Sequence, residues 1–180
     1  MAIDELIFNL STTVFGISAG VEVHAVAIDE GGFTLNINIG WKTVAIPTVL
    51  AGFFHLSESG VVNGFIKGLT GKDIPEYSEQ LGSTLRQWSE SRADYDLIQP
   101  DYPTYVHEEA EEAAGNLLSD LTAAFLEADN ETVRQYAQQT QHVDEAIVSR
   151  KKFFEACLED PAIRAVGFSA ADDFPIQRTE

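Results

Sequence analysis

The feature that most constrains the fold is an alternation of apolar and polar residues within 21–46. Residues 21–28 read VEVHAVAI, residues 29–32 read DEGG, and residues 33–46 read FTLNINIGWKTVAI. Every second residue from Phe33 to Trp41 is apolar, which is typical of a strand with one buried face. The acids and glycines before Phe33 have the chemistry of a turn. The sequence therefore predicts an antiparallel β-hairpin over about 21–46.

Much of the remaining chain has apolar residues at spacings of three and four, which predicts helices. Helices are expected over 3–15, from Pro47 to about 56, over 61–71, from Tyr77 to Trp88, over 106–128 and over 131–158. A capping box, Asp73-x-x-Glu76, precedes the fourth of them. In the last helix the apolar spacing stays near 3.5 residues, which predicts one long helix packed against another.

Together these segments predict an α+β fold in a single domain over 1–180. A small antiparallel sheet packed with helices is expected to form an apolar layer over about 1–75. A long acidic helical hairpin is expected to form a second layer over about 76–168, and residues 169–180 are expected to be a tail. A chain of 180 residues buries a core without disulfides, and its one cysteine, Cys157, is expected to lie in that core.

The charge balance restricts the partners of such a chain. Against 29 acidic residues there are 11 basic ones, a formal net charge of −18. Phosphate binding needs lysine and arginine, so direct nucleic-acid binding is not expected. No run of about 20 apolar residues is present, so no membrane span is expected either. The first ten residues carry acids where a signal peptide carries bases, and the expected location is cytoplasmic.

Residues 16–20 read GISAG and match the G-x-S-x-G pattern of a nucleophile elbow around Ser18. Such an elbow has a strand before the serine and a helix after it, and the helix helps to form the oxyanion site. Here the predicted order is inverted, with a helix before Ser18 and a strand from Val21. The two glycines then serve to turn the backbone. A small hydrolase using Ser18 is kept as an alternative.

Histidines and acids are arranged in ways that do not predict a metal site. His55 and His142 each precede a glutamate by three residues, Glu58 and Glu145, which is the reverse of the di-metal bundle motif. The aspartates within 94–101 lack the central glycine of an EF-hand, and Ile98 stands at its third ligand position. No metal and no cofactor is therefore expected.

Between Ala93 and Val133 there are eleven acidic residues and no lysine or arginine. Four of these acids stand close together near the start of a predicted helix: Glu108, Glu109, Glu111 and Glu112. The helix dipole favours acids in a first turn, which is a purely structural explanation. As a surface, the same acids would steer a basic partner protein. The sequence leaves both explanations open, together with adaptation to salt.

The other notable stretch, residues 45–69, is apolar and glycine-rich with only two charges. It is expected to be a buried helical pair, an assembly surface or a cleft for an apolar ligand. The residues expected to take part are Trp41, Phe53, Phe54, Phe65 and Ile66. The function expected is that of a non-enzymatic acidic interaction protein that forms homo-oligomers and binds a basic partner. A binding module for a small apolar ligand is the first alternative.

Overall fold

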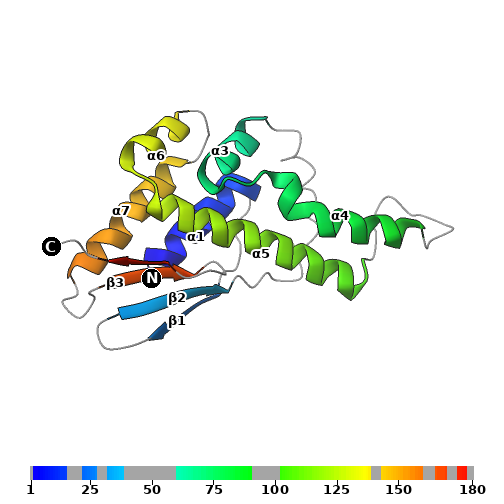
Figure 1. Cartoon of the computed structure of the whole chain (residues 1–180), viewed down its shortest axis with the longest axis horizontal. Coiled ribbons are helices and arrows are strands. Elements are labelled where there is room, and N and C mark those ends of the chain that lie inside the picture. The colour runs from blue at the N-terminus through cyan, green and yellow to red at the C-terminus, as the bar shows by residue number, and fades with distance from the viewer. Residues whose placement is uncertain are drawn as a thin grey trace.

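The computed structural model describes residues 2–15, 22–27, 32–38, 60–90, 102–138, 143–159, 165–169 and 174–177. The helices in these ranges are α1 (Ala2–Phe15), α3 (Gly60–Thr70), α4 (Ile74–Glu90), α5 (Thr104–Glu127), α6 (Asn130–Ala137) and α7 (Val143–Glu159) (Figure 1). Strand segments are β1 (Glu22–Ala27), β2 (Gly32–Asn38), β3 (Ala165–Ser169) and β4 (Phe174–Gln177).

The predicted α+β fold is wrong for the part of the chain whose side chains the structure describes. Of these residues, 92% lie in six helices and none lies in a strand. Among the residues whose side chains are described, the core is therefore made by helices packing on helices. The physical reason is that the apolar side chains of α5 cover a broad part of its circumference, so helices can pack against it on several sides.

The strand segments are described by their backbone, and they also differ from the small antiparallel sheet that was predicted. Their order is β1-β2-β3-β4, with β1 antiparallel to β2. However, β2 and β3 are parallel, with Gly32 opposite Ala165. A parallel pair needs a long crossover, and here the chain between the two strands includes five helices of the described part. Strands β3 and β4 also reach into the predicted tail, 169–180.

Helix α5 is the centre of the described core. Its buried side chains are Val106, Ala110, Ala113, Ala114, Leu117, Leu118, Leu121, Thr122, Phe125 and Leu126. The one polar member, Thr122, donates a hydrogen bond of 2.6 Å to the carbonyl of Leu118, so its hydroxyl is satisfied. Helices α1, α3 and α4 all pack against α5, and α4 runs beside its first half (Figure 1).

Helix α1 confirms the helix predicted over 3–15. The apolar residues that predicted it, Ile3, Leu6, Ile7, Leu10 and Val14, are all buried. Its closest neighbour is α7, which runs antiparallel to it. Lys152 Nζ lies 2.7 Å from Glu5 Oε1, and one turn further along α1 the Asn9 amide donates to Ser149 Oγ at 2.7 Å. Helices α1 and α7 are thus joined by polar contacts as well as by burial.

Helices α3 and α4 meet at a turn that follows the predicted capping. Gly71 ends α3 with a φ of 78°, a conformation that favours glycine. Its N–H donates to the carbonyl of Lys67 at 3.0 Å. At the start of α4, the Glu76 carboxylate accepts from the N–H of Asp73 at 3.0 Å, which confirms that half of the predicted capping box.

The predicted long helix over 131–158 is wrong, and with it the long helical hairpin. The chain forms α6 and α7 instead, and the description of α6 ends before α7 begins at Val143. Residues 138–142 read QQTQH, so the near-heptad apolar spacing has no apolar residue there to bury. Asp129 is the N-cap of α6, and its carboxylate accepts a hydrogen bond from the N–H of Thr132 at 2.7 Å. This bond lowers the pKa of Asp129.

Candidate interaction surface

The four clustered acids of the sequence lie together on the solvent side of α5. Glu108 and Glu112 are exposed, and Glu109 and Glu111 are half-buried at the two edges. Because Val106 and Ala110 point into the core, the acids between and after them must point away from it. We call Glu108, Glu109, Glu111 and Glu112 the α5 acidic face.

The helix dipole does not account for this face. Helix α5 begins at Thr104, and its first turn contains no acid. The dipole acts mainly within the first turn, so the α5 acidic face lies at the limit of its reach. Glu108 and Glu112 are instead like charges at spacing i,i+4, which costs an isolated helix about 0.2–0.5 kcal/mol. The acids therefore weaken the helix locally, and the purely structural explanation loses its main support.

None of the four acids of the α5 acidic face forms an ion pair with another described residue. The acidic members of the ion pairs between described residues are Asp73, Asp120, Glu155 and Glu5. Next to the face stands Tyr105, whose side chain is 48% exposed. It precedes Glu108 and Glu109 by three and four residues, so the ring and the carboxylates are neighbours on the helix surface. The surface thus combines negative charge with an aromatic ring.

Two of the predicted apolar residues, Phe65 and Ile66, lie in the core. Their exposed fractions are 1% and 0%. The Phe65 ring meets the ring of Tyr136 edge-on, with 6.1 Å between the centroids. This contact joins α3 to α6. In the described structure these two residues stabilise the helical core, and they offer no exposed surface to a second protein.

The remaining candidates of the sequence fall outside the described residues. These are Ser18, Trp41, Phe53 and Phe54, together with His55, Glu58, His142 and the aspartates within 94–101. Glu145 is described and is exposed on α7. Within the described ranges, no group of three His, Cys, Asp or Glu residues is placed to hold a metal ion. Cys157 is half-buried and packs against the helical core.

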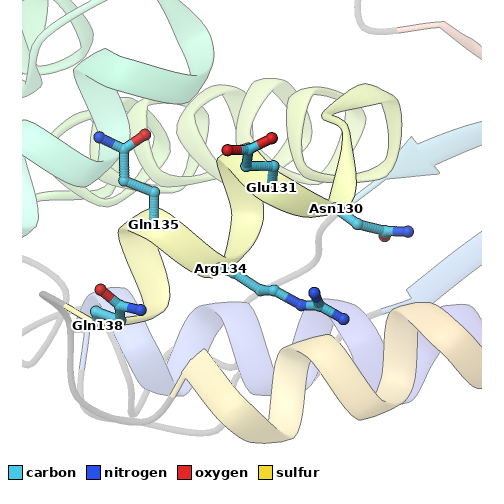
Figure 2. Close-up of a pocket in the computed structure, with 5 residues that line it drawn as sticks. All are labelled: Asn130, Glu131, Arg134, Gln135 and Gln138. Carbon is cyan, nitrogen blue, oxygen red and sulfur yellow. The ribbon is translucent and has the colours of Figure 1, made fainter.

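The structure has a hollow on α6 that is lined by polar and charged side chains. Its lining residues are Asn130, Glu131, Arg134, Gln135 and Gln138. Figure 2 shows their side chains leaving one helix in different directions, with Glu131 and Gln135 on one side and Arg134 on another. General acid–base chemistry needs side chains that converge on a reacting atom. This hollow therefore has no arrangement suited to catalysis.

A polar cluster that the sequence did not reveal joins the α3–α4 turn to α5. Lys72 Nζ and the Tyr77 hydroxyl donate to the same oxygen of Asp120, at 2.8 and 3.0 Å. Burial of the ring, aided by the charge of Asp120, raises the pKa of the Tyr77 hydroxyl. The hydrogen bond from Lys72 to Asp120 raises the pKa of Lys72. Both groups hold their protons at neutral pH, so the cluster is a structural contact.

Arg150 of α7 is a second contact of this kind. Its guanidinium donates to the Leu126 carbonyl at 3.3 Å, to the Ala128 carbonyl, and to Asn130 Oδ1 at 2.8 Å. It also lies over the Phe154 ring, 5.2 Å from the centroid. Burial lowers the pKa of this guanidinium. A cation at the last carbonyls of α5 interacts well with the helix dipole, so Arg150 fixes the α5–α6 junction.

None of the helices in the described ranges is long and apolar enough to cross a membrane. Comparison of the chain with known protein families, with characterised proteins and with solved structures finds no match.

Proposed function

We propose that this protein is a non-enzymatic interaction protein that binds a basic partner protein through the α5 acidic face and also self-associates. The observation that carries the proposal is the placement of four carboxylates on the solvent side of one helix, outside the described ion pairs. Their mutual repulsion lowers helix stability and is relieved when a cation binds. A surface that weakens its own helix in this way is suited to a positively charged partner.

The chemistry of the face favours arginine over lysine in that partner. A guanidinium binds carboxylates through paired hydrogen bonds and stacks on aromatic rings. Tyr105 supplies an exposed ring beside Glu108 and Glu109. A lysine ammonium lacks the planar shape for both contacts at once. The net charge of −18 adds long-range attraction that raises the association rate.

The direct test uses a fluorescent nona-arginine peptide, a nona-lysine peptide and a neutral peptide of equal length as probes. Binding is measured by fluorescence anisotropy in about 0.15 M salt, where the Debye length is about 8 Å. The test variant changes the whole α5 acidic face, Glu108, Glu109, Glu111 and Glu112, to glutamine. The matched control changes four exposed acids elsewhere to glutamine: Glu79, Glu90, Glu131 and Glu159.

We expect the arginine peptide to bind more tightly than the lysine peptide and the neutral peptide not to bind. The test variant should lose about tenfold or more in affinity, a loss of about 1.4 kcal/mol or more, while the control loses little. Because both variants remove four charges, a difference between them reports the site and not the net charge. Equal losses in the two variants would show that only diffuse charge attracts the peptide.

A further inference from the structure

Helix α7 carries a solvent-facing pattern of charge that is complementary to itself. The residues of this α7 stripe are Asp144, Glu145, Val148, Lys151 and Lys152, and all five are exposed. Val148 is an exposed apolar side chain at 53%, and the lysine side chains are 78% and 51% exposed. Relative to Val148, the acids stand at positions −4 and −3 and the bases at +3 and +4. These offsets place all five residues on one side of the helix.

The offsets are symmetric about Val148 and the charges are opposite in sign. If two copies of α7 meet antiparallel on a two-fold axis at Val148, Asp144 lies beside the second copy's Lys151, and Glu145 lies beside its Lys152. Val148 then meets the same residue of the second copy and loses its exposure to water. A parallel arrangement would instead place like charges together. We infer that the α7 stripe is a homodimer interface, occupied by a second copy of this chain.

The same charges cannot satisfy one another within one chain. Asp144 and Lys151 are seven residues apart, about 10 Å along the helix axis, which is too far for an ion pair. Within the described structure, Lys151 pairs with Glu155 at 3.6 Å and Lys152 with Glu5 at 2.7 Å. These are exposed pairs of low individual energy. A second copy brings opposite charges to both ends of the stripe at once.

A groove beside the stripe provides space for the side chains of the second copy. It lies between α1 and α7, and its lining residues are Glu5, Asn9, Asp144, Glu145 and Val148. Three of the five are acidic, and the groove includes both acids of the stripe. A lysine from the second copy therefore meets carboxylates from α1 as well as α7. This groove favours exposed lysines beside an apolar side chain, and α7 itself presents these as Lys151, Lys152 and Val148.

The interface has to act against the net charge of −18 on each copy. In about 0.15 M salt the long-range part of this repulsion is screened beyond about 8 Å, while pairs in contact keep their attraction. One helix face is small compared with a permanent interface, so a weak, concentration-dependent dimer is expected. This inference rests on the self-association that we propose as part of the function, and it does not need the basic partner.

The test is an exchange of charges measured by sedimentation equilibrium. One variant, D144K/E145K, makes the stripe basic throughout, and a second, K151E/K152E, makes it acidic throughout. We expect each alone to raise the dimer dissociation constant about tenfold or more. An equimolar mixture of the two should form a heterodimer. One chain carrying all four changes should form a homodimer again, because complementarity is restored.

The basic variant is the sharper one, because its net charge falls from −18 to −14 as two acids become two bases. General repulsion is weaker in it, so loss of the dimer there can come only from the stripe. E5Q removes both the Lys152–Glu5 pair and the α1 carboxylate of the groove, so it should weaken the dimer, but by less than either double variant. Thermal midpoints show that each variant is folded, and V148E, a single change at the axis, should also give monomers.

The possible failures are distinguishable. A wild-type protein that stays monomeric at high concentration overturns both this interface and the self-association part of the proposed function. A wild-type dimer that the charge changes and V148E leave untouched overturns only the α7 stripe. A mixture of the two variants that stays monomeric, although each variant is folded, also overturns the antiparallel pairing.

Discussion

At the scale of single residues, the helices are held together by close approaches that depend on small or polar side chains. Gly68 of α3 is the clearest case, because a Cβ atom there would overlap the ring and hydroxyl of Tyr136 on α6. Gly64, one turn earlier on the same helix, has open space around its Cα. Tyr136 also touches Phe65, so this contact sets how closely α6 lies against α3.

Changing Gly68 to alanine should therefore destabilise the protein, and changing Gly64 to alanine should not. We expect Gly68→Ala to lower the free energy of unfolding by about 1–3 kcal/mol through overpacking. Gly64→Ala should raise it by about 0.5–1 kcal/mol, because alanine favours an exposed helix position. Urea unfolding measures both. In a Tyr136→Leu background the Gly68 penalty should shrink, and a penalty that stays the same would contradict the contact.

The Tyr77 cluster predicts a loss of stability at alkaline pH. The pKa of the Tyr77 hydroxyl is raised in the folded protein, mainly by burial, above its unfolded value of about 10. The stabilising effect is complete below pH 10 and is lost as the pH rises above it, by at most about 1.4 kcal/mol per pH unit. Urea midpoints between about pH 9 and 11 should fall more steeply in wild type than in Tyr77→Phe. Tyr105→Phe, at an exposed position, is the control and should behave as wild type.

At the scale of elements, the sequence predicted the separate helices better than their assembly. The helices over 3–15, 61–71, Tyr77 to Trp88 and 106–128 correspond to α1, α3, α4 and α5, since each has an unbroken apolar face. The apolar spacing does not show the break before α7, because Thr140 stands at a position of the apolar stripe. The parallel pairing of β2 with β3 joins segments over 120 residues apart, which local periodicity cannot reveal.

For the candidate surfaces too, the sequence shows local features and does not show contacts between distant segments. The α5 acidic face was visible in the sequence, because four acids within five residues need no partner to be noticed. The contacts of Asp120 and Arg150 were not visible, because they join helices far apart in the chain. Apolar periodicity does not reveal the α7 stripe, because the stripe is a symmetry of charge about a single valine.

Arg150 allows a prediction about the α5–α6 junction. Arg150→Ala should cost about 2–3 kcal/mol, because backbone carbonyls and Asn130 lose a charged donor. Arg150→Lys should recover only part of this, since one ammonium cannot reach all the acceptors that a guanidinium reaches. Arg86→Ala, at an exposed position of α4, should be near neutral. If hydrogen exchange of the α6 amides is no faster in Arg150→Ala than in Arg86→Ala, the junction does not depend on Arg150.

At the scale of the whole molecule, the net charge of −18 makes stability depend on salt. Like charges repel more in the compact state than in the expanded one, so screening favours folding. The thermal midpoint should therefore rise between about 0.05 and 0.5 M sodium chloride. A midpoint that is flat or falls over this range would mean that the acids are already compensated in the folded protein.

The α5 acidic face should account for part of that dependence. Glu108→Gln with Glu112→Gln removes one i,i+4 repulsion and should raise stability by about 0.2–0.5 kcal/mol at low salt. Glu90→Gln with Glu131→Gln removes the same charge from positions near Arg86 and Arg134 on their helices, and should not stabilise. Calorimetry at two salt concentrations measures the difference, which should shrink at the higher one. Protein that gains stability while losing affinity for the arginine peptide would show that the face is retained for binding.

The pairing of α1 with α7 also determines when the chain can fold during its synthesis. Asn9 contacts Ser149 and Glu5 contacts Lys152, so the first helix finds its neighbour 140 to 147 residues later. In a nascent chain leaving the ribosome, the apolar face of α1 therefore stays without its neighbour until α7 has emerged. We expect chaperones to protect α1 throughout this interval, and the core to close only after α7 has been synthesised.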